Sequence, residues 1–133
     1  MANVEFFKQQ SKKFFKDYNS RVFNAKEGFY EYSPRYFKDI EEIILSFDIN
    51  EEAPFTLMNA QHIIACLSGF YKWNELIKAS ESALEIGKLL LINRANYQLI
   101  DEWKSYKTQN LKDFDDKDKL DVFKIVMLGQ NYD

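Results

Sequence analysis

The stretch "SPRYFKDIEEIILSFD" at residues 33–48 constrains the fold of this chain most, because its apolar side chains recur at spacings of three and four. Those apolar residues are Tyr36, Phe37, Ile40, Ile43, Ile44 and Phe47. This period places them on one face of an α-helix. Ser33 can cap such a helix, and Pro34 suits its first turn. We therefore predict a helix here, with its apolar face in a core.

The same period predicts further helices along the chain, over residues 3–18, 57–68, from about 73, 80–94, 97–107 and 116–128. Thr56 can cap the helix that follows Pro54, and Gly129 ends the last one. Between residues 19 and 32 the pattern breaks, and "NAKEG" supplies turn residues, which predicts an irregular segment. With no convincing strand alternation, the sequence predicts an all-α fold, a single compact domain over 1–133 of about six or seven helices.

The length of 133 residues fits one domain, and aromatic residues make up 17% of them, enough to fill a core with large rings. A single Cys excludes an internal disulfide and favours a reducing compartment. The first residues lack the apolar run of a signal peptide, and no segment approaches about 18 consecutive apolar residues. We therefore expect a cytoplasmic protein that does not enter a membrane.

The phrase "AQHIIACLSGFYKWNEL" at residues 60–76 invites comparison with a DNA-reading helix-turn-helix. Gln61, Ala65 and Gly69 recur every four residues, as the small residues and the turn glycine of that motif do. However, Glu75 stands where the second helix needs an apolar residue. The acidic net charge of −3 also disfavours binding to phosphates. The phrase therefore does not predict a DNA reader.

The sequence contains few candidates for catalytic or metal-binding residues. His62 and Cys66 share one helix face, but two ligands do not make a metal site, and neither residue type occurs again. A catalytic thiol also needs a base from another element, and no second His can supply it. In "DFDDKDKLD", Asp113 and Asp115 fit a calcium loop, but Lys117 takes the third ligand position. We predict no catalytic residue, no metal and no cofactor.

The central phrase resembles a short helical module of the form A-Q-x-x-I-A-x-x-x-G-F-x-x-W-x-x-L, which occurs in bacterial proteins beside glyoxalase-like and ankyrin-repeat domains. The matching positions are Ala60, Gln61, Ile64, Ala65, Gly69, Phe70, Trp73 and Leu76. The match covers about a fifth of the chain. The resemblance implies a bacterial or phage origin and a helical accessory module without catalytic residues.

A packing role accounts for the same positions without a ligand. We expect the apolar side chains to interlock across the turn: Ile64, Phe70, Trp73 and Leu76. Ala65 and Gly69 would allow the helices to approach closely, and Gln61 would satisfy a backbone group near the junction. Trp73 is expected to be the buried centre of this structural packing motif.

Charge is unevenly distributed along the chain. Residues 1–38 contain eight basic and four acidic side chains, whereas residues 39–55 contain six acidic and no basic ones. The basic candidates for an interaction surface are Lys8, Lys12, Lys13 and Lys16. The lack of predicted catalytic and metal-binding residues, together with the abundant aromatic residues, favours a non-catalytic protein that binds another, unidentified protein. Its role would be regulatory, antitoxin-like or immunity-like. The alternative is nucleic-acid binding by the N-terminal third, which holds eleven of the 22 aromatic residues.

Overall fold

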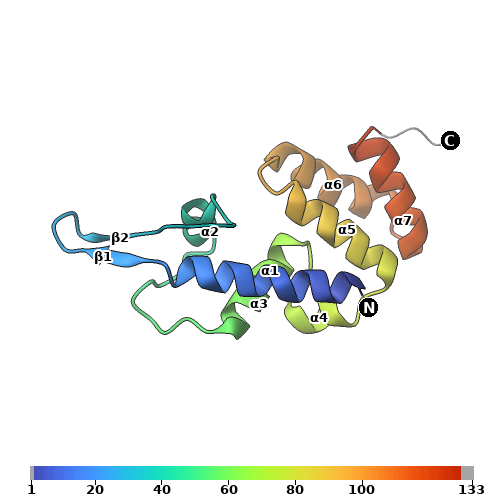
Figure 1. Cartoon of the computed structure of the whole chain (residues 1–133). Helices are drawn as coiled ribbons and strands as arrows, with labels where there is room; N and C mark the ends of the chain where they lie inside the picture. The colour runs from blue at the N-terminus through green and yellow to red at the C-terminus, as the bar shows by residue number, and fades with distance from the viewer. Residues whose placement is uncertain (1, 130–133) are drawn as a thin grey trace. The chain divides into compact units, whose positions relative to one another are not determined.

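The computed structural model describes residues 2–129, and this part of the chain contains seven α-helices, a π-helical segment and one two-stranded sheet (Figure 1). The prediction of an all-α fold is confirmed. The elements are α1 (Ala2–Tyr18), β1 (Val22–Asn24), β2 (Phe29–Glu31), α2 (Ile40–Ser46), α3 (Leu57–Leu67), α4 (Trp73–Ile77), α5 (Glu81–Ile92), α6 (Tyr97–Asn110), α7 (Asp116–Val122) and η1 (Phe123–Met127).

The chain divides into two compact units. The N-terminal unit is Glu5–Ile64, and the C-terminal unit combines Met1–Val4 with Ala65–Asp133. The boundaries fall inside helices, so that α1 and α3 each contribute residues to both units. The expectation of a single domain over 1–133 stays a prediction.

The core of the N-terminal unit is built from aromatic rings around α1. Phe7, Phe14 and Tyr18 are fully buried, as the helical spacing predicts. Phe55, in the loop before α3, stacks on Tyr18 with ring centroids 3.9 Å apart. Phe37 meets Phe14 edge to face, with centroids 5.3 Å apart. These rings hold a unit whose only long helices are α1 and α3.

The prediction that residues 19–32 are irregular is wrong, because β1 and β2 form an antiparallel hairpin there. Asn24 closes the turn: its side-chain oxygen accepts hydrogen bonds from the backbone N–H groups of Lys26 and Glu27. Gly28 follows with a φ of +78°, which only glycine adopts without strain. Phe23 pairs with Tyr30 across the strands. The strands are three residues long, too short for a visible alternation of apolar and polar residues.

The helix predicted from Ser33 begins instead at Ile40, so Ser33 and Pro34 do not start it. The reason lies in α1. The carboxylate of Asp17, which is 2% exposed, accepts hydrogen bonds from three successive backbone N–H groups, those of Arg35, Tyr36 and Phe37, at 2.9, 2.9 and 2.6 Å. These N–H groups therefore bind a distant anion and not a local cap.

The C-terminal unit contains α4 to α7, with α5 in contact with α7 and α6 in contact with η1 (Figure 1). Its core is aliphatic around one aromatic pair: Trp103 of α6 meets Phe123 of η1 edge to face, with centroids 4.8 Å apart. Ser80, Asn96 and Asp115 cap α5, α6 and α7, and each accepts from the backbone N–H three residues ahead. The predicted helices 80–94 and 97–107 are confirmed, and the predicted helix 116–128 becomes α7 followed by η1.

Candidate functional site

The base of the hairpin is fixed by a stacked cluster in the N-terminal unit. The guanidinium of Arg21 lies 4.2 Å from the ring centre of Tyr18 and 5.4 Å from that of Tyr30. It also donates hydrogen bonds to the carbonyl oxygens of Tyr18, at 3.2 Å, and Glu51, at 3.5 Å. Arg21 therefore ties the start of β1 to α1, to β2 and to the loop that follows α2.

A second tie joins the end of β2 to the same loop. The hydroxyl of Tyr32 donates a 2.5 Å hydrogen bond to Oε2 of Glu51. Burial raises the pKa of Tyr32, and the Glu51 carboxylate raises it further. Tyr32 therefore stays protonated at neutral pH and holds Glu51 in a fixed position.

An acidic pocket of about 290 Å³ opens beside this tie, entirely within the N-terminal unit. Three carboxylates line it, those of Glu41, Asp48 and Glu51, and no Lys or Arg does. The remaining wall residues are aromatic or aliphatic: Phe29, Tyr30, Tyr32, Ile44, Leu45 and Ile49. Rings beside carboxylates form a surface that attracts a cation with an apolar stem.

Asp48 enters this pocket from a helix end. Its φ of +51° is left-handed, and α2 closes there with two hydrogen bonds, from Asp48 N–H to the Leu45 oxygen and from Ile49 N–H to the Ile44 oxygen. This pattern is a Schellman helix end, in which glycine usually occupies the position that Asp48 takes here. The chain therefore keeps a carboxylate in the pocket wall at a small conformational cost.

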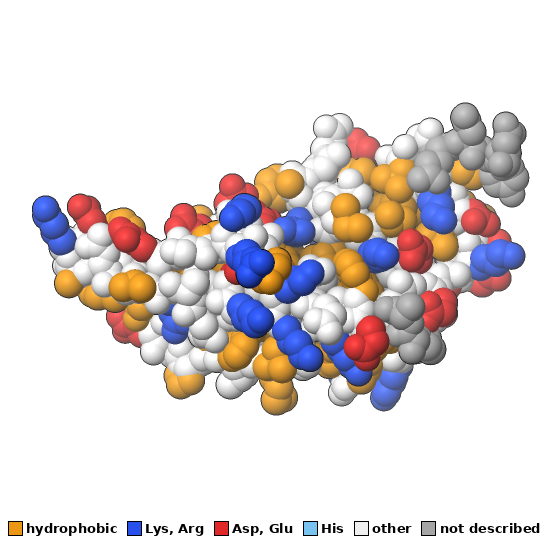
Figure 2. All heavy atoms as spheres, viewed as in Figure 1, with side chains coloured by type: hydrophobic (Ala, Val, Ile, Leu, Met, Phe, Trp, Pro, Cys, Tyr) orange, Lys and Arg blue, Asp and Glu red, His pale blue; other side chains and the backbone are white. Residues whose placement is uncertain are grey.

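Large apolar side chains are exposed around the pocket and along the hairpin. Leu45 is 83% exposed and Phe29 is 51% exposed, and both line the pocket. Val22 and Phe23 add to this surface on β1. Figure 2 shows hydrophobic side chains gathered on the hairpin, at the left of the view. Exposed apolar side chains beside a charged pocket are typical of a protein-binding surface.

The four lysines predicted as an interaction surface do not all face solvent. Lys8, Lys12 and Lys16 are exposed and lie four residues apart, along one side of α1. Lys8 pairs with Glu5 at 3.6 Å, a surface contact of little energetic weight. Lys13 is half-buried, with its ammonium 5.2 Å from the ring centre of Tyr36. Figure 2 shows Lys and Arg side chains gathered over α1.

Arg35 lies over the same ring of Tyr36, 5.5 Å from its centre. Tyr36 is 39% exposed, so the structure places an accessible aromatic ring close to two cations, Lys13 and Arg35. Such a combination suits a phosphate beside a stacked base.

The predicted packing motif is partly buried. Ile64, Ala65 and Leu76 are fully buried, whereas Gln61, Phe70 and Trp73 are only half-buried. The expectation that Trp73 is the buried centre is therefore corrected. The fully buried Trp is Trp103, at 1% exposed, because α6 packs it against η1.

The turn at Gly69 forms as predicted. Gly69 has a φ of +87°, and the N–H groups of Phe70 and Gly69 donate to the oxygens of Ala65 and Cys66, which is a Schellman end for α3. The second helix of the phrase, α4, is five residues long. That length gives little helix to lie in a DNA groove.

The thiol of Cys66 is half-buried, and burial raises its pKa. It makes a long contact of 3.8 Å with the carbonyl oxygen of Tyr71. Since the thiolate is the nucleophile, a raised pKa makes this thiol less reactive at neutral pH. His62 is exposed on α3. Within residues 2–129, no group of three or more His, Cys, Asp or Glu side chains could hold a metal ion.

Comparison with known protein families, curated proteins and solved structures finds no match to this chain. The resemblance of residues 60–76 to a bacterial helical module therefore stays a prediction. Among the described residues, no helix has the length and apolar character needed to cross a membrane.

Sequence reasoning missed the acidic pocket, although one signal pointed to it. Residues 39–55 hold six acidic and no basic side chains, and all three pocket carboxylates come from this segment. The aromatic walls come from β2 and from Tyr32 directly after it, in the segment that was predicted to be irregular. Without the hairpin, the rings could not be placed beside the carboxylates.

Proposed function

We propose that this chain is a non-catalytic protein-binding module, and that its N-terminal unit captures a basic side chain of a partner protein. The observation that carries the proposal is the acidic pocket, where three carboxylates and three aromatic rings surround a space with no cation in its wall. A Lys or Arg side chain could place its aliphatic stem against the rings and its charge near the carboxylates.

The exposed apolar residues at the rim of the pocket predict that the partner also has apolar residues beside its basic one. Phe29 and Leu45 would contact apolar residues on either side of the basic one. Acidic walls repel phosphates, so this pocket suits a protein and not a nucleic acid. A regulatory, antitoxin-like or immunity-like role, a bacterial or phage origin and a cytoplasmic location all stay predictions.

A pair of synthetic peptides tests the pocket. One carries lysine between leucine and phenylalanine, and the other has the uncharged norleucine in place of lysine. In a nuclear magnetic resonance titration of the full chain, we expect the lysine peptide to shift the amide signals of Tyr32, Leu45 and Asp48, and to bind about tenfold more tightly than its neutral match. Equal binding of the two peptides would contradict the proposal.

Matched variants separate the pocket from general surface charge. Glu41→Gln removes one carboxylate from the pocket wall, whereas Glu27→Gln removes one from the exposed hairpin turn. We expect Glu41→Gln to weaken the lysine peptide several-fold and Glu27→Gln to leave its affinity unchanged. The same loss in both variants would mean that the peptide senses net charge and not the pocket.

Nucleic-acid binding is the second candidate, and the exposed ring of Tyr36 close to Lys13 and Arg35 favours it. A gel shift with single-stranded oligonucleotides at low salt tests this candidate, since the phosphate contribution is strongest there. Binding that weakens with salt and with Tyr36→Ala would support it. The absence of a shift at low salt would remove it.

A further inference from the structure

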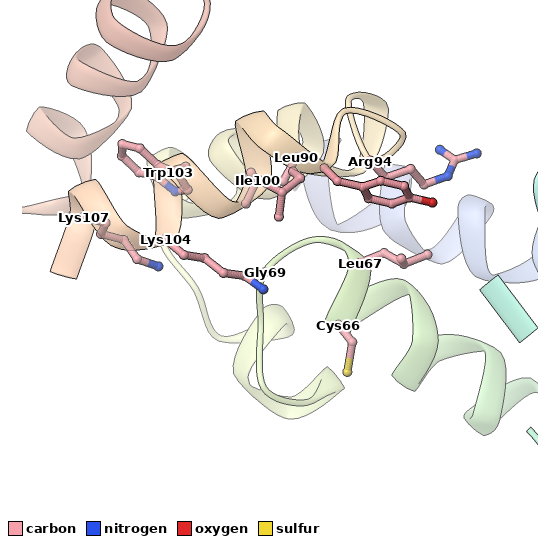
Figure 3. A pocket seen from close by; sticks show the side chains of 10 residues that line it. Cys66, Leu67, Gly69, Leu90, Arg94, Ile100, Trp103, Lys104 and Lys107 are labelled. Atoms are coloured by element: carbon pink, nitrogen blue, oxygen red, sulfur yellow. The ribbon is translucent and has the colours of Figure 1, made fainter. Parts of the chain in front are cut away.

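A second pocket, of about 200 Å³, lies within the C-terminal unit and has the opposite charge. Figure 3 shows its walls: the end of α3 with Leu67, the Gly69 turn, Leu90 of α5, and Ile100 of α6. The side chains of Leu67, Leu90 and Ile100 form an apolar floor. Three cations also line it, and none of the ten lining residues is acidic. These cations are Arg94, Lys104 and Lys107.

The turn after α3 shapes this space. A Cβ atom added at Gly69 would lie 2.8 Å from Cδ1 of Leu90, so the turn backbone packs directly on that side chain. On the far side, Arg94 is anchored at the end of α5 by a 2.9 Å hydrogen bond from Nη1 to the Leu91 carbonyl oxygen. The Gly69 turn and the Arg94 side chain are thus held in place by packing and hydrogen bonding before any ligand enters.

Lys104 and Lys107 lie one turn apart on α6, and Figure 3 shows both side chains extending toward the Gly69 turn. Burial lowers the pKa of Lys107, and the positive charges of Lys119 and Lys104 lower it further, while Glu75 opposes them. The structure records no ion pair for either lysine among its described residues. Two cations that repel each other beside an apolar floor leave positive charge for an anion to balance.

We propose that this pocket binds a small aromatic carboxylate, with its ring on the apolar floor and its carboxylate between Lys104 and Lys107. Size supports one ring, since an apolar cavity of about 150 Å³ accommodates benzene. The ligand needs both parts, because the side chains of Leu67, Leu90 and Ile100 offer no polar partner and the two ammonium groups offer no apolar one.

Three probes test the two parts of this ligand separately: benzoate, the neutral benzamide and the small anion acetate. We expect benzoate to bind the full chain about tenfold more tightly than either of the others by calorimetry, since each lacks one half of the recognition. Benzoate should also shift the signals of the Ile100 methyl groups and the Trp103 indole. Benzamide binding as tightly as benzoate would overturn the role of the lysines, and acetate binding as tightly would overturn the role of the floor.

Variants then place the site. Lys104→Gln and Lys107→Gln should each weaken benzoate several-fold, whereas Lys112→Gln, on an exposed residue outside the pocket, should not. Glutamine keeps much of the aliphatic stem, so the melting temperatures should stay close to that of the wild type. Equal losses in all three variants, or no shift of the Ile100 and Trp103 signals, would overturn the proposal. The acidic pocket lies in the other unit. The outcome of the lysine-peptide test there would therefore not affect the result with benzoate.

Discussion

The helix caps recorded for α5, α6 and α7 of the C-terminal unit are all local, whereas the N-terminal unit combines local caps, such as Thr56 at the start of α3, with one long-range cap. In the C-terminal unit, Ser80, Asn96 and Asp115 cap helices from within the same turn, three residues away. In the N-terminal unit, Asp17 reaches from α1 to N–H groups 18 to 20 residues further along the chain. Local caps are visible in a sequence, whereas a distant anion is visible only after folding.

The two cores differ in the same sense. Rings of Phe14, Tyr18, Phe37 and Phe55 meet in the N-terminal unit, from segments on either side of a hairpin. The C-terminal core follows the helical period of α5, α6 and α7 around Trp103. The first depends on contacts between segments far apart in sequence, and the second on consecutive amphipathic helices. The following variants test this difference.

The largest loss of stability is expected for Trp103→Ala. Trp103 is 1% exposed and packs on Phe123, so its removal leaves a cavity that costs about 3–5 kcal/mol. Trp73 is half-buried on α4, and Trp73→Ala should cost about 1–2 kcal/mol. Urea unfolding of both variants measures the difference. A loss for Trp73→Ala as large as that for Trp103→Ala would restore Trp73 as a buried centre.

Asp17→Asn is expected to cost about 2–3 kcal/mol, because asparagine has one acceptor oxygen and no charge for three N–H donors. Hydrogen exchange gives the local measurement: the amides of Arg35, Tyr36 and Phe37 should lose protection. Glu27→Gln is the control, since it removes a carboxylate from an exposed turn. Unchanged exchange of the three amides would refute the role given to Asp17.

These contacts explain how much of the fold could be predicted. The helical period predicted α1, α3, α5 and α6 closely, with Thr56 as the expected cap of α3, since those elements need only their own residues. The start of α2 was missed because Asp17 takes the N–H groups that precede it. The hairpin was missed because the contacts that tie it to the rest of the unit, such as Arg21 over the Tyr30 ring, join residues that no sequence pattern links, and three-residue strands carry no readable alternation.

The candidate sites were less predictable than the fold. The lysines of α1 were recognised from their spacing, yet only the structure places Lys13 and Arg35 on one ring. The acidic pocket joins residues of β2, α2 and the loop after it, and no motif links those positions. A pocket is a product of tertiary structure, so residue spacing along one helix could not reveal it.

A smaller effect separates the two turns that depend on glycine. Gly69→Ala meets both a left-handed φ and Leu90 at 2.8 Å, and should cost about 2–3 kcal/mol. Gly28→Ala in the hairpin meets the same kind of φ in open space, and should cost about 1 kcal/mol. Thermal unfolding of the pair isolates the packing contribution at Gly69. Equal losses would mean that Leu90 moves aside freely.

The smallest effect has the opposite sign. Asp48 holds a φ of +51° at the end of α2, a conformation that costs a residue with a Cβ atom some free energy. Asp48→Gly should therefore stabilise the N-terminal unit by about 0.5–1 kcal/mol. The same change removes a carboxylate from the acidic pocket, so it should weaken binding of the lysine peptide several-fold.

Asp48→Asn is the matched variant: asparagine tolerates this φ and lacks the charge, so binding should fall while stability stays nearly constant. Thermal unfolding and the peptide titration, performed on both variants, separate the two roles. A peptide affinity that is unchanged in both variants would show that Asp48 sets the helix end and takes no part in recognition.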